Sequence, residues 1–160
     1  MICVRPATHS DAADVAPRLR MADLQEVSAS LGEPPINVLE EGIAASDPCY
    51  AVTDKAGCVL ALFGVVPQAD NREVGRIWLL GSQELVADRF YFARNSRLWI
   101  DCLQQRYRVL WNWVDARNEV HIRWLEWCGF RLTAVDDAFG VEGRPFYEFQ
   151  RVRNDAPRGK

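Results

Sequence analysis

The apolar positions of this sequence change period along the chain, and each change marks an expected element. Helical spacing of apolar residues predicts helices, whereas alternation and short apolar runs predict strands. The expected strands are residues 2–5, 49–53, 58–67, 73–80, 109–114, 131–138 and 145–152. The expected helices are residues 12–27, 35–45, 88–107 and 118–128, with turn-forming residues between the elements.

Short polar signals mark the ends of the expected helices. Thr8 and Asp11 have the spacing of a capping box ahead of the first helix, and Pro17 interrupts that helix. Asn118 is expected to cap the last helix, which Gly129 ends with a backbone conformation that favours glycine. The order β-α-α-β-β-β-α-β-α-β-β predicts an α/β (α+β) domain, in which helices cover both faces of one mixed sheet.

Length and composition agree with a single domain. The 160 residues, 49% hydrophobic and 26% charged, can bury a core and are not globally disordered. We expect one domain over residues 1–153 and a polar C-terminal tail over residues 154–160. No apolar run reaches the ~20 residues of a membrane span, so no membrane contact is expected. The net charge of -3 disfavours direct binding of nucleic acid.

The thiols and imidazoles do not form a metal-binding pattern. The five cysteines contain no C-x-x-C pair, and His9 and His121 are the two histidines. This set gives no support to a zinc site. We therefore predict no metal, and buried, reduced cysteines.

Three segments carry recognisable family motifs. Residues 4–11 are similar to an R-x-A-x-x-x-D opening, and the strand 109–114 is followed by Asn118 and then by Gly129-Phe130. With the closing hairpin, this order resembles the GNAT (Gcn5-related N-acetyltransferase) family over residues 2–152. The resemblance implies a single GNAT-like domain with a central, mixed, mostly antiparallel sheet.

A second set of residues has a narrower resemblance. The segments 110–114 and 121–125, together with Asn118 and Gly129, resemble the internal virion protein A family of short-tailed phages, and residues 77–82 resemble a strand of that family. This resemblance implies a location in the virion or the host cytoplasm. It also implies that the partners are other phage virion proteins.

The GNAT resemblance implies a cofactor site that this sequence does not reproduce. GNAT enzymes bind the pyrophosphate of acetyl-CoA with a [QR]-x-x-G-x-[GA] loop at the start of the long helix. Here Gly81 is the only glycine between residues 81 and 90, while Glu84 and Asp88 add negative charge. The tyrosine that many of these enzymes place seven positions after the asparagine falls on Leu125, which cannot donate a proton. We therefore predict no cofactor.

If the chain is nevertheless active, a few residues are candidates for the site. Glu73 and His121 are the catalytic candidates, and Leu79, Leu80, Arg89 and Asn118 are the candidates for contacts with acetyl-CoA. Each has a plainer interpretation beside it. Glu73 begins a strand, where carboxylates are commonly solvated, His121 lies in the first turn of a short helix, and Asn118 can serve as the N-cap alone.

The missing site and the phage resemblance lead to our prediction of function. We predict a phage virion-associated or assembly protein, not an enzyme, acting through protein-protein contacts. The expected contact residues are Trp111, Trp113, His121, Arg123, Trp124 and Trp127. The alternative is an active acyl-CoA-dependent N-acetyltransferase with an atypical cofactor loop. A second alternative is a small regulator of a host protein, and the oligomeric state is left open.

Overall fold

The computed structural model describes residues 2–87 and 89–154, except for the side chains of residues 86–91. The strands are β1 (Cys3–Pro6), β2 (Cys49–Thr53), β3 (Val59–Pro67), β4 (Val74–Gly81), β5 (Val109–Asp115), β6 (Arg131–Phe139) and β7 (Arg144–Val152). The helices are α1 (Asp11–Val15), the 3-10 turn η1 (Ala16–Arg18), α2 (Met21–Ser30), α3 (Pro35–Ala45), α4 (Gln83–Ala87), α5 (Arg89–Arg106) and α6 (Glu119–Trp127). Apart from Asn154, the expected polar tail lies outside the described residues.

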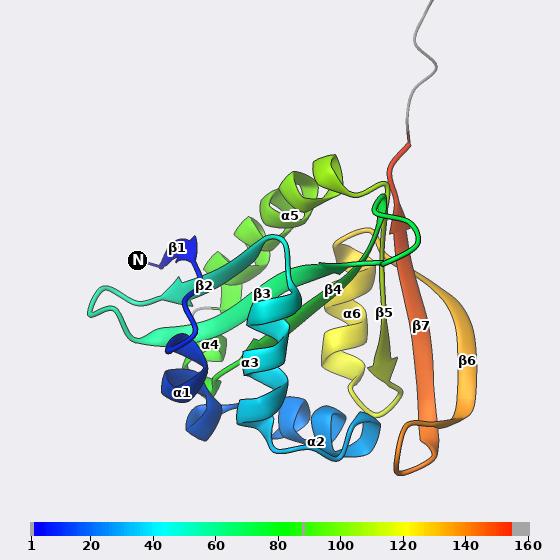
Figure 1. Cartoon of the computed structure of the whole chain (residues 1–160), viewed down its shortest axis with the longest axis horizontal. Coiled ribbons are helices and arrows are strands. Elements are labelled where there is room, and N and C mark those ends of the chain that lie inside the picture. The colour runs from blue at the N-terminus through cyan, green and yellow to red at the C-terminus, as the bar shows by residue number, and fades with distance from the viewer. Residues whose placement is uncertain (1, 88, 155–160) are drawn as a thin grey trace, which may run out of the picture.

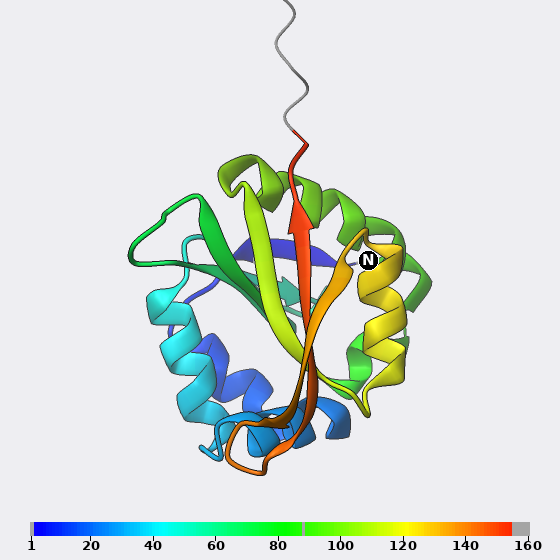
Figure 2. The ribbon, with the colours of Figure 1, turned by 90° about the vertical axis from the view of Figure 1, so that its right-hand side faces the viewer.

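The strands form one seven-stranded sheet in the order β1-β2-β3-β4-β5-β7-β6. Among the described strands, β4 and β5 run parallel, and every other neighbouring pair is antiparallel. Helices α1, α2 and α3 lie on one side of the sheet, and α5 and α6 lie on the other (Figures 1 and 2). The predicted mixed, mostly antiparallel sheet with helices on both faces is confirmed.

Each face of the sheet has its own hydrophobic core. Under α5 and α6 the buried residues include Leu60, Phe63, Val65, Leu103, Leu110, Val114 and Leu125. Under α1 and α3 they include Val15, Leu19, Leu39, Val59, Leu62 and Leu80. Successive residues of a strand point to opposite faces, so the central strands β3 and β4 supply side chains to both cores.

The R-x-A-x-x-x-D opening is an ion pair that joins β1 to α1. Both terminal nitrogens of Arg5 donate to the carboxylate of Asp11 over 2.8 Å, and the Thr8 N–H donates to the same carboxylate over 2.7 Å. Hydrogen bonds from Arg5 hold the pKa of Asp11 below its usual value although the side chain is buried. Half of the predicted capping box is therefore present, because the N–H of Asp11 donates to the carbonyl of Thr8 over 3.0 Å and not to its hydroxyl.

The first helix is not continuous, contrary to our expectation for residues 12–27. Pro17 lies in the turn η1, and Leu19 then has an extended backbone. Proline lacks the N–H that a continuous helix would use there. Leu19 pairs with Ser82, which brings the start of α2 to the end of β4. The long helix expected over residues 88–107 is present as α5, and the short helix α4 before it was not predicted.

The cysteines are only partly buried. Cys128 is buried, Cys49 and Cys58 are half-buried, and Cys3 and Cys102 are exposed, so the expectation of buried thiols is wrong for two of the five. Among the described residues, no group of three or more His, Cys, Asp or Glu side chains could hold a metal ion. No helix in this part of the chain is long and apolar enough to span a membrane.

Candidate active site

The parallel strands β4 and β5 separate after a short ladder, and this opening creates the candidate site. The ladder pairs Val74, Gly75 and Arg76 with Val109, Leu110 and Trp111. Beyond it, Nδ2 of Asn112 donates to the carbonyl of Ile77 over 2.7 Å, while its Oδ1 accepts from the N–H of Trp113 over 2.7 Å. An amide side chain thus occupies the place of the next backbone bond and holds the strands apart.

A cavity of about 630 Å³ lies in this opening. Its lining comes from α2 and α3 on one face of the sheet, and from α5 and α6 on the other. Residues of β4, β5 and the β6–β7 hairpin lie between these helices. Figure 1 shows β4 and β5 diverging, with α6 beside them. The cavity therefore extends through the thickness of the sheet.

The backbone of β4 presents a donor and an acceptor to the cavity at Leu79. On the side toward β5, the carbonyl of Ile77 is hydrogen-bonded by the side chain described above. The carbonyl of Gly81 accepts from the N–H of Arg20 over 2.9 Å, and the N–H of Gly81 donates to Asp23 over 2.9 Å. Backbone groups of alternate residues in a strand point to the same side, so the Leu79 N–H and C=O also face the opening.

Glu26 of α2 reaches the opening from the face of the sheet that α2 and α3 cover. Its Oε1 accepts hydrogen bonds from the N–H of Asp115 and from Nδ2 of Asn118, each over 3.1 Å. Burial raises the pKa of Glu26 to about 7, against the hydrogen bond from Asn118 and with help from the charge of Asp23. A carboxyl group that titrates near pH 7 can both accept and return a proton there.

Asn118 and His121 lie at the start of α6, where Asn118 contacts Glu26. Oδ1 of Asn118 accepts from the N–H of His121 over 3.4 Å, which confirms the predicted N-cap of α6. The ring of His121 lines the cavity with its centroid 5.4 Å from that of Trp124. Burial and the charge of Arg20 lower the pKa of His121 to about 4, so this imidazole is neutral at pH 7 and a weaker base than Glu26.

The part of the α5–α6 wall around Phe92 and Trp124 is apolar, and the indole N–H and the hydroxyl there are hydrogen-bonded. Nε1 of Trp124 donates to Oγ of Ser96 over 3.1 Å, and that hydroxyl donates to the carbonyl of Ala93 over 2.8 Å. The ring of Phe92 stacks on Trp124 with centroids 5.9 Å apart. This wall suits a flexible, mostly apolar chain.

The other sequence candidates lie in different places. Glu73 is exposed just before β4, at the end of the β4–β5 ladder away from the cavity. Its carbonyl accepts from the N–H of Val109, and the residue does not line the cavity. Leu80 lines the cavity, but its backbone pairs with β3. The side chain of Arg89 lies outside the described residues. Leu125 lines the cavity where many GNAT enzymes have a tyrosine, and no described tyrosine side chain replaces it.

The predicted contact residues do not gather on one surface. Trp113, His121 and Trp124 line the cavity, whereas Trp111, Arg123 and Trp127 lie outside it. Trp127 is 47% exposed, with the guanidinium of Arg97 4.9 Å above its ring. Of the predicted contact tryptophans, Trp113 and Trp124 thus line the cavity, whereas Trp111 and Trp127 do not.

The residues fit the thioester arm of an acyl-CoA better than its pyrophosphate. The cavity and the Leu79 backbone suit an acylated chain that carries amide groups. At the end of β4, however, both backbone groups of Gly81 are already bonded within the chain. Glu84 lies in the first turn of α4 and pairs with Arg18 over 3.5 Å. Among the described residues, a glycine-rich phosphate cradle is absent.

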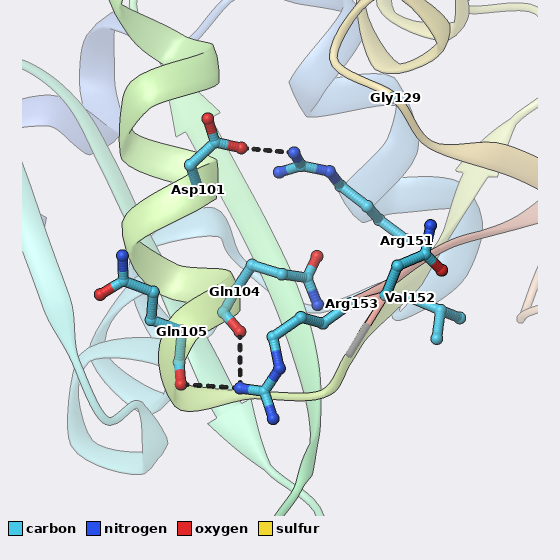
Figure 3. A pocket seen from close by; sticks show the side chains of 8 residues that line it. Asp101, Gln104, Gln105, Gly129, Arg151, Val152 and Arg153 are labelled. Atoms are coloured by element: carbon cyan, nitrogen blue, oxygen red, sulfur yellow. Dashed lines mark hydrogen bonds and ion pairs between the residues drawn. The ribbon is translucent and has the colours of Figure 1, made fainter. Parts of the chain in front are cut away.

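A second pocket, of about 420 Å³, lies between the last turns of α5 and the end of β7 (Figure 3). Figure 3 shows Arg151 paired with Asp101, and Arg153 donating to the carbonyl groups of Gln104 and Gln105. Both guanidinium groups therefore bind to the end of α5, and we assign no ligand to this pocket.

Comparison with known proteins identifies the fold. No family model and no curated protein matches this sequence. A GNAT superfamily phosphinothricin acetyltransferase from Sinorhizobium meliloti, solved with AcCoA, has a TM-score of 0.75 at 18% identity, over 99% of this chain and 92% of that one. The ribosomal-protein-S18-alanine N-acetyltransferase from Escherichia coli has a TM-score of 0.71 at 15% identity, over 100% and 99%. A GCN5-related N-acetyltransferase from Kribbella flavida has a TM-score of 0.69 at 18% identity, over 95% and 98%.

These matches correct two predictions made from the sequence. The virion or assembly role is wrong, because the matched structures are N-acetyltransferases and give no support to the phage family. The prediction of no cofactor is also wrong, since the Sinorhizobium meliloti enzyme was solved with AcCoA. The comparisons favour the enzyme alternative, and the chain has the fold of the GNAT acetyltransferases.

Proposed function

We propose that this protein is an acyl-CoA-dependent N-acyltransferase whose two substrates meet in the opening between β4 and β5. One observation carries the proposal. The cavity brings the Leu79 backbone of β4 and the Glu26 carboxyl group of α2 to the same space. Fold similarity to N-acetyltransferases supports it.

The residues divide between the two substrates by their position. When bound, acetyl-CoA supplies an acyl group activated as a thioester. Its arm would lie against the α5–α6 wall of Phe92 and Trp124, with the Leu79 N–H available to a carbonyl oxygen. The acceptor amine then enters from the α2–α3 face, where Glu26 takes up its proton.

Proton balance at the site follows from the same geometry. An amine that enters as an ammonium ion loses one proton before it attacks and a second when the amide forms. Glu26, whose pKa of about 7 is matched to neutral pH, takes up the first, and the second balances the proton that the thiolate gains. The departing thiolate must gain a proton. No described tyrosine side chain lines the cavity, so we assign this proton to solvent that enters through the cavity mouth.

An assay of thiol release tests the proposal. The purified chain is mixed with acetyl-CoA and a panel of primary amines, and calorimetry measures the binding of acetyl-CoA separately. We expect amine-dependent thiol release, which Glu26→Gln slows by about 10²–10⁴-fold without weakening acetyl-CoA binding. Glu126→Gln, an exposed change on α6, is the matched control and keeps the activity. Absence of both binding and thiol release contradicts the proposal.

A further inference from the structure

An aromatic wall borders the α2–α3 side of the cavity. The ring of Trp113 stacks on Phe139 with centroids 4.9 Å apart, and Phe139 stacks on Phe146 at 4.5 Å. All three residues line the cavity. They come from β5, β6 and β7, so the wall is part of the sheet and its hairpin. Because these rings stack face to face, the row presents ring edges and the outer face of its end ring as an apolar contact surface.

A fourth ring faces the cavity from β4. Nε1 of Trp78 donates to Oγ of Ser46 over 2.8 Å, which fixes the indole against α3. Gly42 leaves room for this ring, because a Cβ there would lie 2.8 Å from it. Trp78 and Trp113 lie on the two strands that diverge, so aromatic groups border the opening from both strands.

The turn between β6 and β7 closes one end of the cavity mouth, by which we mean the opening of the cavity on the α2–α3 side. The N–H groups of Val141 and Glu142 donate to the last carbonyls of α2, those of Ser30 and Ala29, over 3.3 and 3.1 Å. Gly140 lies so close to these carbonyls that a Cβ would come within 2.6 Å of the Ala29 oxygen and 2.8 Å of the Ser30 oxygen. The mouth is therefore bounded by the turn, α2 and α3, which favours a small acceptor over a folded protein.

The charges at this mouth favour a single amine. Glu26 and Glu41 line it together with Arg76. Two further carboxylates nearby are already paired, since Asp23 and Asp115 each bind an arginine, over 3.0 and 2.6 Å. A polyamine would need several unpaired carboxylates along its length, whereas one amine needs only Glu26.

We propose that the acceptor is a small primary amine carried on a flat aromatic group. This proposal rests on the proposed acyltransferase function. The aromatic part lies against the wall of Trp113 and Phe139, and the amine is directed to the carboxyl group of Glu26. Rings border the amine's path, and a cationic amine is attracted to ring faces as it enters.

The choice among amines tests this class directly. Tryptamine and phenethylamine are compared with n-butylamine and spermidine, using acetyl-CoA and the full chain. We expect kcat/KM for the aromatic amines to exceed that for n-butylamine by at least about tenfold. Trp113→Leu should remove this preference, Trp113→Phe should restore part of it, and the exposed control Trp127→Leu should keep it. Thermal unfolding confirms that each variant is folded.

Two results overturn the proposal. Spermidine or n-butylamine could be preferred over the aromatic amines, in which case the acceptor class is wrong although acyl transfer stands. If no amine releases thiol, calorimetry with tryptamine decides whether the aromatic amine site exists. Binding that Trp113→Leu weakens about tenfold, and Trp127→Leu does not, supports the aromatic amine site and rejects acyl transfer. Absence of tryptamine binding rejects the site.

Discussion

Glu26 shows how surroundings change the chemistry of one residue. The same carboxyl group on the surface would titrate near its usual pKa and would always be charged at pH 7. Here burial raises its pKa to about 7, and the two hydrogen bonds to its Oε1 keep the group in the opening. The residue is therefore half protonated at neutral pH, which is the state that suits proton transfer.

From the raised pKa of Glu26 we predict how the free energy of unfolding changes with pH. A carboxyl group whose pKa is higher in the folded state stabilises that state fully below its unfolded pKa, and the stabilisation is lost as the pH rises through the folded pKa. The window for Glu26 runs from 4.5 to about 7. We expect the Glu26→Gln variant to gain about 1–3 kcal/mol relative to wild type between pH 4.5 and 8. Urea unfolding at both pH values measures this.

The control for this measurement is Glu126→Gln, since that side chain is exposed on α6. Its free energy of unfolding should stay parallel to that of wild type across the pH range. Parallel curves for Glu26→Gln as well would contradict the raised pKa of Glu26.

At the scale of elements, the β6–β7 hairpin and α2 depend on one another. The turn of the hairpin supplies N–H donors to carbonyls that the end of a helix otherwise leaves unpaired. The same contact positions Glu26 beneath β5 and Phe139 beside the cavity. The site thus depends on a contact between segments that lie far apart in the sequence.

Alanine substitutions at two glycines of this turn distinguish the cost of losing the contact with α2 from the cost of a positive φ angle. Gly140 and Gly143 both have a positive φ, of 68° and 64°, but only at Gly140 would a Cβ meet the backbone of α2. We expect Gly143→Ala to cost about 1–2 kcal/mol from the φ angle alone. Gly140→Ala should cost about 1–3 kcal/mol more, because α2 must move. Urea unfolding of both variants tests this, and equal losses would contradict it.

The elements were largely predictable from the sequence, but their ends and contacts were not. Apolar periodicity and the Asn118 cap gave the strands and α6 with small errors at the boundaries. The break at Pro17 was underestimated, because the pairing of Leu19 with Ser82 decides it and is a long-range contact. Glu26 could not be found, since its partner Asp115 is 89 positions away and its pKa depends on burial.

The function was predicted wrongly for a related reason. We predict no cofactor because the residues after Gly81 lack the glycines of the usual acetyl-CoA loop and because Leu125 stands in place of the usual tyrosine. The opening of a sheet leaves no such local motif. It depends on Asn112 facing Ile77 across two strands, which only the tertiary structure shows.

At the scale of the whole molecule, the sheet consists of two parts joined by one short ladder. β1 to β4 form one part and β5 to β7 the other, and three residue pairs connect them. Asn112 continues this connection through its side chain, and the hairpin turn on α2 adds a second connection. These contacts and the core under α5 and α6 join the two parts beside the cavity.

Replacing Asn112 should therefore weaken the junction. Asn112→Ala leaves the carbonyl of Ile77 and the N–H of Trp113 without their partner, which we expect to cost about 1–3 kcal/mol of unfolding free energy. Amide exchange at Trp113 should accelerate. The control Asn71→Ala removes an exposed hydrogen bond to the N–H of Glu73 and should cost less than about 1 kcal/mol. Equal losses would show that the junction does not depend on Asn112.

The passage of the cavity through the sheet has a kinetic consequence. Two reactants that enter from opposite faces need not wait for each other, and neither blocks the path of the other. In the acyl transfer that we propose, both substrates can be present at once, and the acyl group would pass directly between them without being stored on the protein. Each product can then leave through the same end of the cavity by which its substrate entered. Neither product has to cross the binding site of the other.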